Sequence, residues 1–172
     1  MMIGLRLMLP REELLGEIAA YKLEMQQNGS SMDGCGSLYR HSPEEWLANC
    51  RSISREETCP EGWVPATQYV CVNADGRIIG MIDLRRRFNE YLAEIGGNIG
   101  YSVRPSERRR GYATRMLALV LDEARAIGMQ RVLVTCDADN EASRRVIERN
   151  GGVFERMTQD EGAAIRRYWI QL

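Results

Sequence analysis

The chain has 172 residues, of which 44% are hydrophobic and 27% charged, and its formal net charge at pH 7 is −1. This length and composition are typical of a single globular domain with a core of its own. The charge argues against a protein that holds nucleic acid through bulk positive charge. No apolar run is long enough to cross a bilayer, and no signal-peptide pattern is present, so we expect a cytoplasmic protein without nucleic-acid or membrane partners.

The cysteine content points away from a disulfide framework and from a zinc site. The count is odd, and no CxxC spacing occurs. Reduced thiols in a cytosolic protein fit this pattern, and we predict no metal site. The five cysteines are Cys35, Cys50, Cys59, Cys71 and Cys136.

The N-terminal part predicts a strand, a helix and a loop. Residues 2–9 are expected to form the strand, which Pro10 ends, and residues 11–27 carry apolar positions at helical spacing. Residues 28–37 are rich in Gly and Ser and predict a loop. This loop is either a flap over a substrate site or a plain surface loop.

A second helix is predicted from Pro43 to about Arg55. Ser42 can cap it, Pro43 suits its first position, and Glu45 completes a capping box. His41 precedes this helix and could act as a base, but no partner for it is visible in the sequence.

The next segments predict a loop over residues 58–65 and a β-hairpin. Residues 66–73 alternate as a strand does, residues 73–76 form a tight turn in which Gly76 is free to take positive φ, and residues 77–88 return as the partner strand.

Three consecutive arginines, Arg85, Arg86 and Arg87, end this second strand. A strand end that emerges into water explains them more simply than a site for an acidic ligand does. Residues 89–97 are expected to be an irregular connection, and residues 98–104 a strand that ends at a proline.

Residues 108–128 predict a basic, glycine-containing turn that continues directly into an amphipathic helix, with Gly128 as its stop. The first N–H groups of a helix have no internal partner, and the helix dipole adds positive potential there. Gly111 permits close approach of a ligand to the backbone. The turn is therefore either an anion cradle suited to a phosphate or a surface turn with solvated arginines.

Four segments complete the chain. Residues 131–137 predict a buried strand, and residues 140–152 a helix with a glycine stop. Residues 152–159 and 164–172 predict an antiparallel strand pair around Glu161-Gly162. Tyr168 and Trp169 should point to opposite faces of the last strand.

The order strand, Arg-x-x-Gly-x-Ala turn, helix, strand, Asn-x-x-Ser helix resembles the GNAT superfamily of acyl-CoA N-acyltransferases. Arg108, Gly111 and Ala113 match the cofactor-binding pattern of that family in register. The resemblance is clear over residues 66–172 and loose over the N-terminal part. It implies one domain over residues 1–172, in which residues 1–65 form the acceptor side and residues 66–172 the cofactor-binding core.

The resemblance also implies an α/β fold. The expected fold has a mixed, mostly antiparallel sheet of six to seven strands, with helices on both faces and with parallel, splayed fourth and fifth strands. Acetyl-CoA would lie in the gap between these two strands. The implied cofactor-binding residues are Tyr101, Ser102, Val103, Arg108, Arg109, Arg110, Gly111, Tyr112, Ala113, Thr114, Asn140 and Ser143. For Asn140, an ordinary helix N-cap is the alternative.

The sequence departs from the family at its acid and base positions. Ile147 stands where many members carry the Tyr that protonates the CoA thiolate, and Gly97 and Asn98 stand where others carry a Glu as general base. Neither titrates, so the catalytic residues stay open. Tyr101, Cys136 and Tyr168 are the fallback candidates. A covalent acyl-enzyme on Cys136 is less plausible than a buried strand cysteine.

The function that follows is acetyl transfer from acetyl-CoA to a primary amine of a small molecule or peptide, by direct attack in a ternary complex. A CoA-binding sensor that has lost turnover is the alternative. A nucleotide or nucleic-acid binder that uses the arginine runs is a third possibility. Because dimers are common in the family, the resemblance also favours a homodimer.

Overall fold

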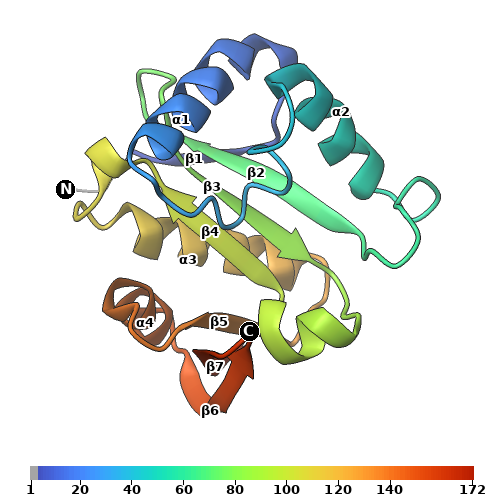
Figure 1. Cartoon of the computed structure of the whole chain (residues 1–172), viewed down its shortest axis with the longest axis vertical. Helices are drawn as coiled ribbons and strands as arrows, with labels where there is room; N and C mark the ends of the chain where they lie inside the picture. The colour runs from blue at the N-terminus through green and yellow to red at the C-terminus, as the bar shows by residue number, and fades with distance from the viewer. Residues whose placement is uncertain (1–3) are drawn as a thin grey trace.

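The computed structural model of the chain describes residues 4–172, and this part contains seven strands and four α-helices (Figure 1). In chain order these are β1 Arg6–Met8, α1 Leu15–Gln27, α2 Pro43–Ile53, β2 Ala66–Val72, β3 Ile78–Arg85, β4 Ile99–Val103, α3 Tyr112–Ala126, β5 Arg131–Asp137, α4 Glu141–Arg149, β6 Val153–Asp160 and β7 Ala163–Gln171.

A four-stranded antiparallel sheet in the order β1-β2-β3-β4 forms the centre of the fold. Helices α1 and α2 cover one face of it and α3 covers the other (Figure 1). Neighbouring strand residues divide between the two layers, because successive side chains point to opposite faces. Val70 and Met81 pack in the cluster with α1 and α2, whereas Cys71 and Ile82 pack in the cluster with α3.

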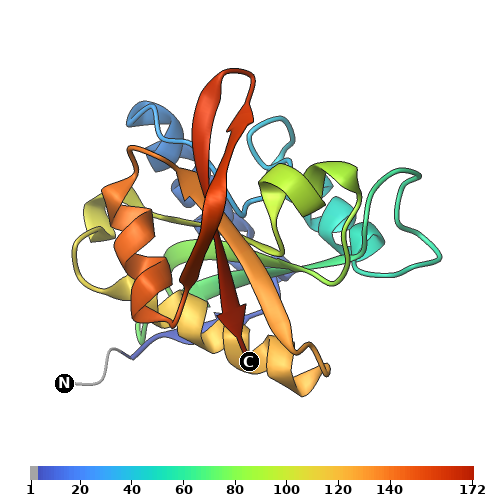
Figure 2. The same cartoon turned by 90° about the horizontal axis from the view of Figure 1, so that it is seen from below.

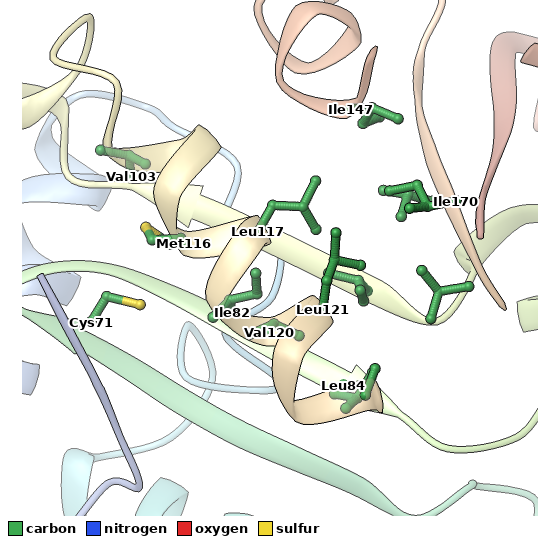
Figure 3. Close-up of a cluster of buried hydrophobic side chains, with 14 of the residues drawn as sticks. Cys71, Ile82, Leu84, Val103, Met116, Leu117, Val120, Leu121, Ile147 and Ile170 are labelled. Carbon is green, nitrogen blue, oxygen red and sulfur yellow. The ribbon is translucent and has the colours of Figure 1, made fainter. Parts of the chain in front are cut away.

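Helix α3 supplies the centre of the larger core (Figure 3). Met116, Leu117 and Val120 are fully buried, and Figure 3 draws them beside Ile82 of β3. The spacing that predicted this helix therefore identified its buried face correctly. Gly128, with φ of 84°, follows the end of the helix as expected.

The three remaining strands form a second antiparallel sheet in the order β5-β7-β6. The β6–β7 hairpin extends away from the body of the molecule (Figure 2). Its turn is the predicted Glu161-Gly162 pair, and both residues have positive φ.

The two sheets are joined where β4 begins. The N–H of Asn98 donates to the carbonyl oxygen of Leu133 at 2.7 Å, and the N–H of Leu133 donates to the Asn98 side-chain oxygen at 2.8 Å. Among the residues that the structure describes, β4 and β5 are not paired further along. The expected α/β fold, with six to seven strands and helices on both faces, is confirmed, with the sheet divided at this junction.

Several predicted bounds were wrong for reasons of pairing. The first strand covers only Arg6–Met8. It cannot begin earlier, because Arg6 already pairs with Val72, the last residue of β2 before the turn at 73–76. Residues 2 and 3 of that prediction lie outside the described part of the chain. Strand β3 ends at Arg85, which pairs with the first residue of β2.

The helical predictions need smaller corrections. The first helix begins with a 3₁₀ turn, Glu12–Leu14, before α1. The connection at 89–97 is not wholly irregular, since Leu92–Gly96 form a π-helical turn, η2. A further 3₁₀ turn, Pro105–Glu107, follows β4. The capping box of Ser42 and Glu45 on α2 is confirmed.

Candidate active site

A cavity of about 1190 Å³ opens between β4 and the elements around β5. This volume slightly exceeds the range of about 300–1,000 Å³ that is typical of small-molecule sites. Its lining combines both predicted parts of the chain, from Trp46 and Trp63 on one side to Tyr112 and Asn140 on the other. The cavity is therefore large enough for a long ligand together with a second one.

The start of α3 forms one end of this cavity. Gly111 is the residue before the helix and takes the left-handed conformation, with φ of 80° and no side-chain cap. Across residues 4–172, no N–H from Arg109 to Thr114 finds a hydrogen-bond acceptor, whereas Arg115 already donates to Gly111. Of the residues whose N–H groups lack an acceptor, all except Arg110 line the cavity. Such a run of free N–H groups at a helix N-terminus is suited to an anion.

The three arginines of this turn differ in what they contact. Arg108 folds back, and its side chain donates to the carbonyl oxygen of Val103 at 3.0 Å and to Ser30 Oγ at 2.9 Å. Arg110 pairs with Glu107 at 3.0 Å and does not line the cavity. Arg109 is exposed and lines it. Arg108 thus braces the turn against β4 and the loop at 28–37.

Strand β4 presents an unpaired edge to the cavity. The N–H of Arg104 donates to Ile79 on β3, and because hydrogen-bonding directions alternate along an antiparallel strand, Ser102 also faces β3. Tyr101 and Val103 therefore direct their backbone groups to the open edge. Of the three residues predicted to contact a ligand through the backbone, these two are placed to do so.

The Ser102 side chain takes part in a different, buried group. Its hydroxyl lies 2.9 Å from the phenolic oxygen of Tyr21 and 3.2 Å from the sulfur of Cys35. Burial raises the pKa of the Cys35 thiol to about 12. These contacts attach α1 and the loop at 28–37 to β4.

The loop at 28–37 lies against β4 and is not a plain surface loop. Gly34 has φ of 70°, and a Cβ there would meet the carbonyl oxygen of Gly100. Gln68 of β2 donates to the carbonyl oxygen of Gly34 at 2.6 Å. Because Ser30, Asp33 and Gly34 line the cavity, the loop forms part of its wall.

The first turn of α4 forms another part of the wall. Asn140 caps the helix, since its side-chain oxygen accepts from the N–H of Ser143 at 3.0 Å, and both residues line the cavity. Ser143 Oγ lies 2.7 Å from the phenolic oxygen of Tyr101. The alternative role of Asn140 as a helix N-cap is thus confirmed, and it leaves Asn140 at the cavity surface, where its cofactor contact stays a prediction.

The two non-titrating positions have structural roles. Asn98 is buried and uses its side chain to bond both Leu133 and the carbonyl oxygen of Arg85. Ile147 is fully buried in the core with α3 (Figure 3). Neither residue is among those that line the cavity.

The fallback catalytic candidates are separated by the structure. Tyr168 is buried against Phe154 and is not a lining residue, whereas Tyr101 and Cys136 line the cavity. Burial raises the pKa of the Tyr101 phenol well above its usual value and that of the Cys136 thiol to about 11. Both groups are therefore protonated near neutral pH.

The prediction for the arginine run after β3 was wrong at its first residue. Arg85 is half-buried and donates to Asp83 Oδ2 at 3.1 Å and to the carbonyl oxygen of Gly96 at 2.8 Å. Arg86 and Arg87 are exposed, as predicted. Arg85 thus attaches the end of β3 to η2.

Carboxylates of the cavity wall were missed by the sequence reasoning. Asp83 is 7% exposed and lies on β3, and Asp33, Asp137 and Asp160 come from three other segments. A single acidic residue inside the apolar strand IIGMIDLR was the available signal for Asp83. His41 is not a lining residue, and its ring Nδ1 lies 3.0 Å from the carbonyl oxygen of Ser37.

Residues 4–172 contain no group of three or more His, Cys, Asp or Glu side chains placed to hold a metal ion. None of the helices described there has the length and apolar character needed to cross a membrane. The five cysteines are unpaired.

Comparison with known proteins gives one family match and many structural ones. The model of the acetyltransferase (GNAT) domain family matches residues 5–153. No curated protein sequence matches the chain.

Three of the similar solved structures illustrate the fold. RimJ from Mycobacterium smegmatis in complex with CoA-disulfide has a TM-score of 0.73 and 20% identity, over 97% of this chain and 81% of that one. The ribosomal-protein-S5-alanine acetyltransferase from Vibrio fischeri has a TM-score of 0.75 and 17% identity, over 98% of this chain and 93% of that one. A spermidine N-acetyltransferase SpeG chimera from Vibrio cholerae and hSSAT has a TM-score of 0.70 and 14% identity, over 98% of this chain and 95% of that one. At these identities the likeness establishes the fold.

Proposed function

Because the chain belongs to the GNAT acetyltransferase family, we propose that it transfers an acetyl group from acetyl-CoA to a primary amine. The observation that carries the proposal is the run of N–H groups from Arg109 to Thr114 that have no acceptor within residues 4–172, at residues that, apart from Arg110, line the cavity. A diphosphate offers the acceptors and the negative charge that such a helix start favours. RimJ, solved with CoA-disulfide, supports CoA as the ligand.

In the proposed complex the diphosphate of acetyl-CoA lies at the start of α3 and its pantetheine arm lies along β4. The carbonyl oxygen of Tyr101 and the N–H of Val103 would pair with the arm, since Arg108 already occupies the carbonyl oxygen of Val103. The N–H of Tyr101 would hold the thioester oxygen as negative charge develops on it. Donors fixed on a strand need no rearrangement during the reaction. Arg109, Tyr112 and Asn140 are the proposed side-chain contacts, since they line the cavity without being buried.

The acceptor would enter from the side formed by α2, the loop at 28–37 and the turn before β2. Trp46, Trp63 and Asp83 line this part of the cavity. Because these residues come from both the N-terminal part and the core, we treat the whole chain as one acetyltransferase domain. The solved relatives named above act on a ribosomal-protein alanine or on spermidine, which supports an amine as acceptor.

The experiment has two parts. Binding of acetyl-CoA is measured by isothermal titration, and transfer is measured as the release of free CoA thiol with a panel of amines that includes spermidine, amino acid amides and short peptides. Amine-dependent release of CoA, with the acetylated amine seen by mass spectrometry, is the expected result. Absence of acetyl-CoA binding would overturn the proposal.

One alternative function is favoured by a specific observation. Ile147 and Asn98, at the family's acid and base positions, are both buried and cannot titrate. A protein that binds acetyl-CoA tightly and releases no CoA with any amine of the panel would be a sensor of the cofactor and not an enzyme.

A further inference from the structure

The carboxylate of Asp83 occupies space beside β4 that is free because Gly100 of β4 has no side chain. A Cβ built on Gly100 would lie 3.2 Å from Asp83 Oδ1 and 3.0 Å from the backbone nitrogen of Gly34. Asp83 pairs directly with Gly100 across the sheet. The carboxylate thus reaches the cavity surface from the neighbouring strand, next to Tyr101 on the open edge.

The position of this carboxylate is fixed by two donors. The N–H of Gly100 donates to Oδ1 at 2.9 Å, and Arg85 Nε donates to Oδ2 at 3.1 Å. Arg85 is itself held by the carbonyl oxygens of Gly96 and Gly97. A carboxylate has about four lone-pair sites, so two fixed donors leave lone pairs for a third partner.

The surroundings of Asp83 keep it away from bulk water. The residue is 7% exposed, yet it lines the cavity together with Gln68, its partner on β2. Cys35, from the loop, and Cys50, from α2, are titratable groups near Asp83, since burial and, to a lesser degree, the charge of Asp83 raise the pKa of both thiols. Burial raises the pKa of both thiols to about 12, so near neutral pH they carry no charge.

We propose that Asp83 is the general base of acetyl transfer and accepts the proton that the attacking amine loses. The inference rests on the proposed function. As the amine lone pair forms the C–N bond, the nitrogen becomes positive and its proton acidic enough for a carboxylate to take. The C–S bond then breaks and its electron pair leaves on sulfur. Asp83 returns the proton to water or to the CoA thiolate, so that an amine and acetyl-CoA give an amide and CoA thiol.

The test compares the kcat/KM of the wild type with that of Asp83→Asn from pH 5 to pH 9, using the amine most active in the panel above. Ionisation of the amine affects both proteins equally and cancels in the ratio. We expect a ratio of about 10²–10⁴ at neutral and higher pH. The ratio should become smaller toward acid pH, because general-base catalysis requires the deprotonated form of the base. Asp139→Asn, which removes a charge near the cavity without touching its wall, is the matched control and should give a ratio near one.

A merely structural role would give a different result. Loss of packing would raise the KM for acetyl-CoA or lower the melting temperature. The ratio of kcat/KM between wild type and variant would then not change with pH. We expect acetyl-CoA affinity to be unchanged in Asp83→Asn and activity to return in part in Asp83→Glu, which also serves if the Asn variant is unstable. A ratio near one, or one independent of pH, would overturn the role of Asp83 and leave the acetyltransferase intact. Absence of transfer by the wild type would instead remove the proposed function.

Discussion

The phenolic oxygen of Tyr101 on β4 lies 2.7 Å from Ser143 Oγ on α4 and 3.4 Å from the Ser143 carbonyl oxygen, so the phenol joins the central sheet to the helix at the cavity wall. Both residues were expected to contact the cofactor, and the structure pairs their side chains with each other.

Loss of this contact should affect stability more than chemistry. Tyr101→Phe should lower the free energy of unfolding by about 1 kcal/mol, which corresponds to about 2–4 °C in Tm. Because burial raises the pKa of the phenol, its proton is a poor one to transfer, and we expect the turnover rate to change less than about tenfold. Ser143→Ala is the control: it leaves the bond to the Ser143 carbonyl oxygen in place and should cost less, and the double variant should lose no more than Tyr101→Phe alone. Turnover slowed by about two orders of magnitude or more would identify Tyr101 as an acid.

The start and the end of α3 offer a matched pair of glycines for testing the anion cradle. Gly111 and Gly128 both have positive φ, at 80° and 84°, so a Glu at either position costs about 1–2 kcal/mol of backbone strain. Only Gly111→Glu places a carboxylate where the diphosphate is proposed to lie. We expect it to weaken acetyl-CoA binding at least about 100-fold, or about 2.7 kcal/mol, while Gly128→Glu binds normally. Equal affinities by isothermal titration would refute the cradle.

Much of the fold was predictable because local signals and tertiary structure agree. The helix at 112–126 has a continuous apolar face, and the α2 capping box and the turn at 73–76 use residues with strong local preferences. Strand ends were less predictable, because pairing depends on where the partner strand stops. Strand β1 is short for this reason.

The site was predictable only in its backbone part. The glycine and the helix start that open the cradle are local features, whereas the fold-back of Arg108 onto Val103 depends on a contact that periodicity does not encode. Asp83, the proposed base, was missed because its access to the cavity depends on Gly100, which lies beside it on another strand. The residue pattern along β3 cannot show that the neighbouring residue on β4 has no side chain.

The junction of the two sheets depends on Asn98, whose buried side chain satisfies the N–H of Leu133 and the carbonyl oxygen of Arg85. Asn98→Ala leaves both groups without these partners, and each unsatisfied buried group costs about 1–3 kcal/mol. We therefore expect a loss of about 2–6 kcal/mol in urea unfolding. Asn89 makes the same two kinds of bond nearer to solvent, with Leu92 and Gly62. Asn89→Ala should cost less, and equal losses would contradict the role of Asn98.

Cys136 lines the cavity, but its chemistry should not contribute to transfer. Burial raises the pKa of its thiol to about 11, so at pH 7 the thiolate needed for nucleophilic attack is scarce. We expect Cys136→Ser to turn over within about threefold of the wild-type rate, since transfer by direct attack needs no thiolate. Mass spectrometry after incubation with acetyl-CoA alone should find no acetyl group on Cys136. A stable acetyl adduct that the Ser variant lacks would instead favour a covalent route.

Asp137, at the end of β5, should destabilise the fold at neutral pH. Burial raises the pKa of its carboxyl, and the charges of Asp33, Asp139 and Asp160 raise it further. A carboxyl group whose pKa is higher in the folded state contributes stability below its unfolded pKa, about 3.9, and loses that contribution as the pH rises through the folded pKa.

Asp137→Asn should therefore raise Tm at pH 7 and leave it almost unchanged at pH 3. Because Asp137 as a whole is exposed, solvent screens its partly buried carboxyl, and the gain should stay below about 1 kcal/mol, or about 2–4 °C. Asp75→Asn, in the β2–β3 turn, makes the same change in net charge at a site away from this cluster and should not reproduce the gain. Thermal unfolding at the two pH values checks the prediction. A gain at pH 3 as large as at pH 7 would mean that the effect of the substitution does not come from the ionised carboxylate.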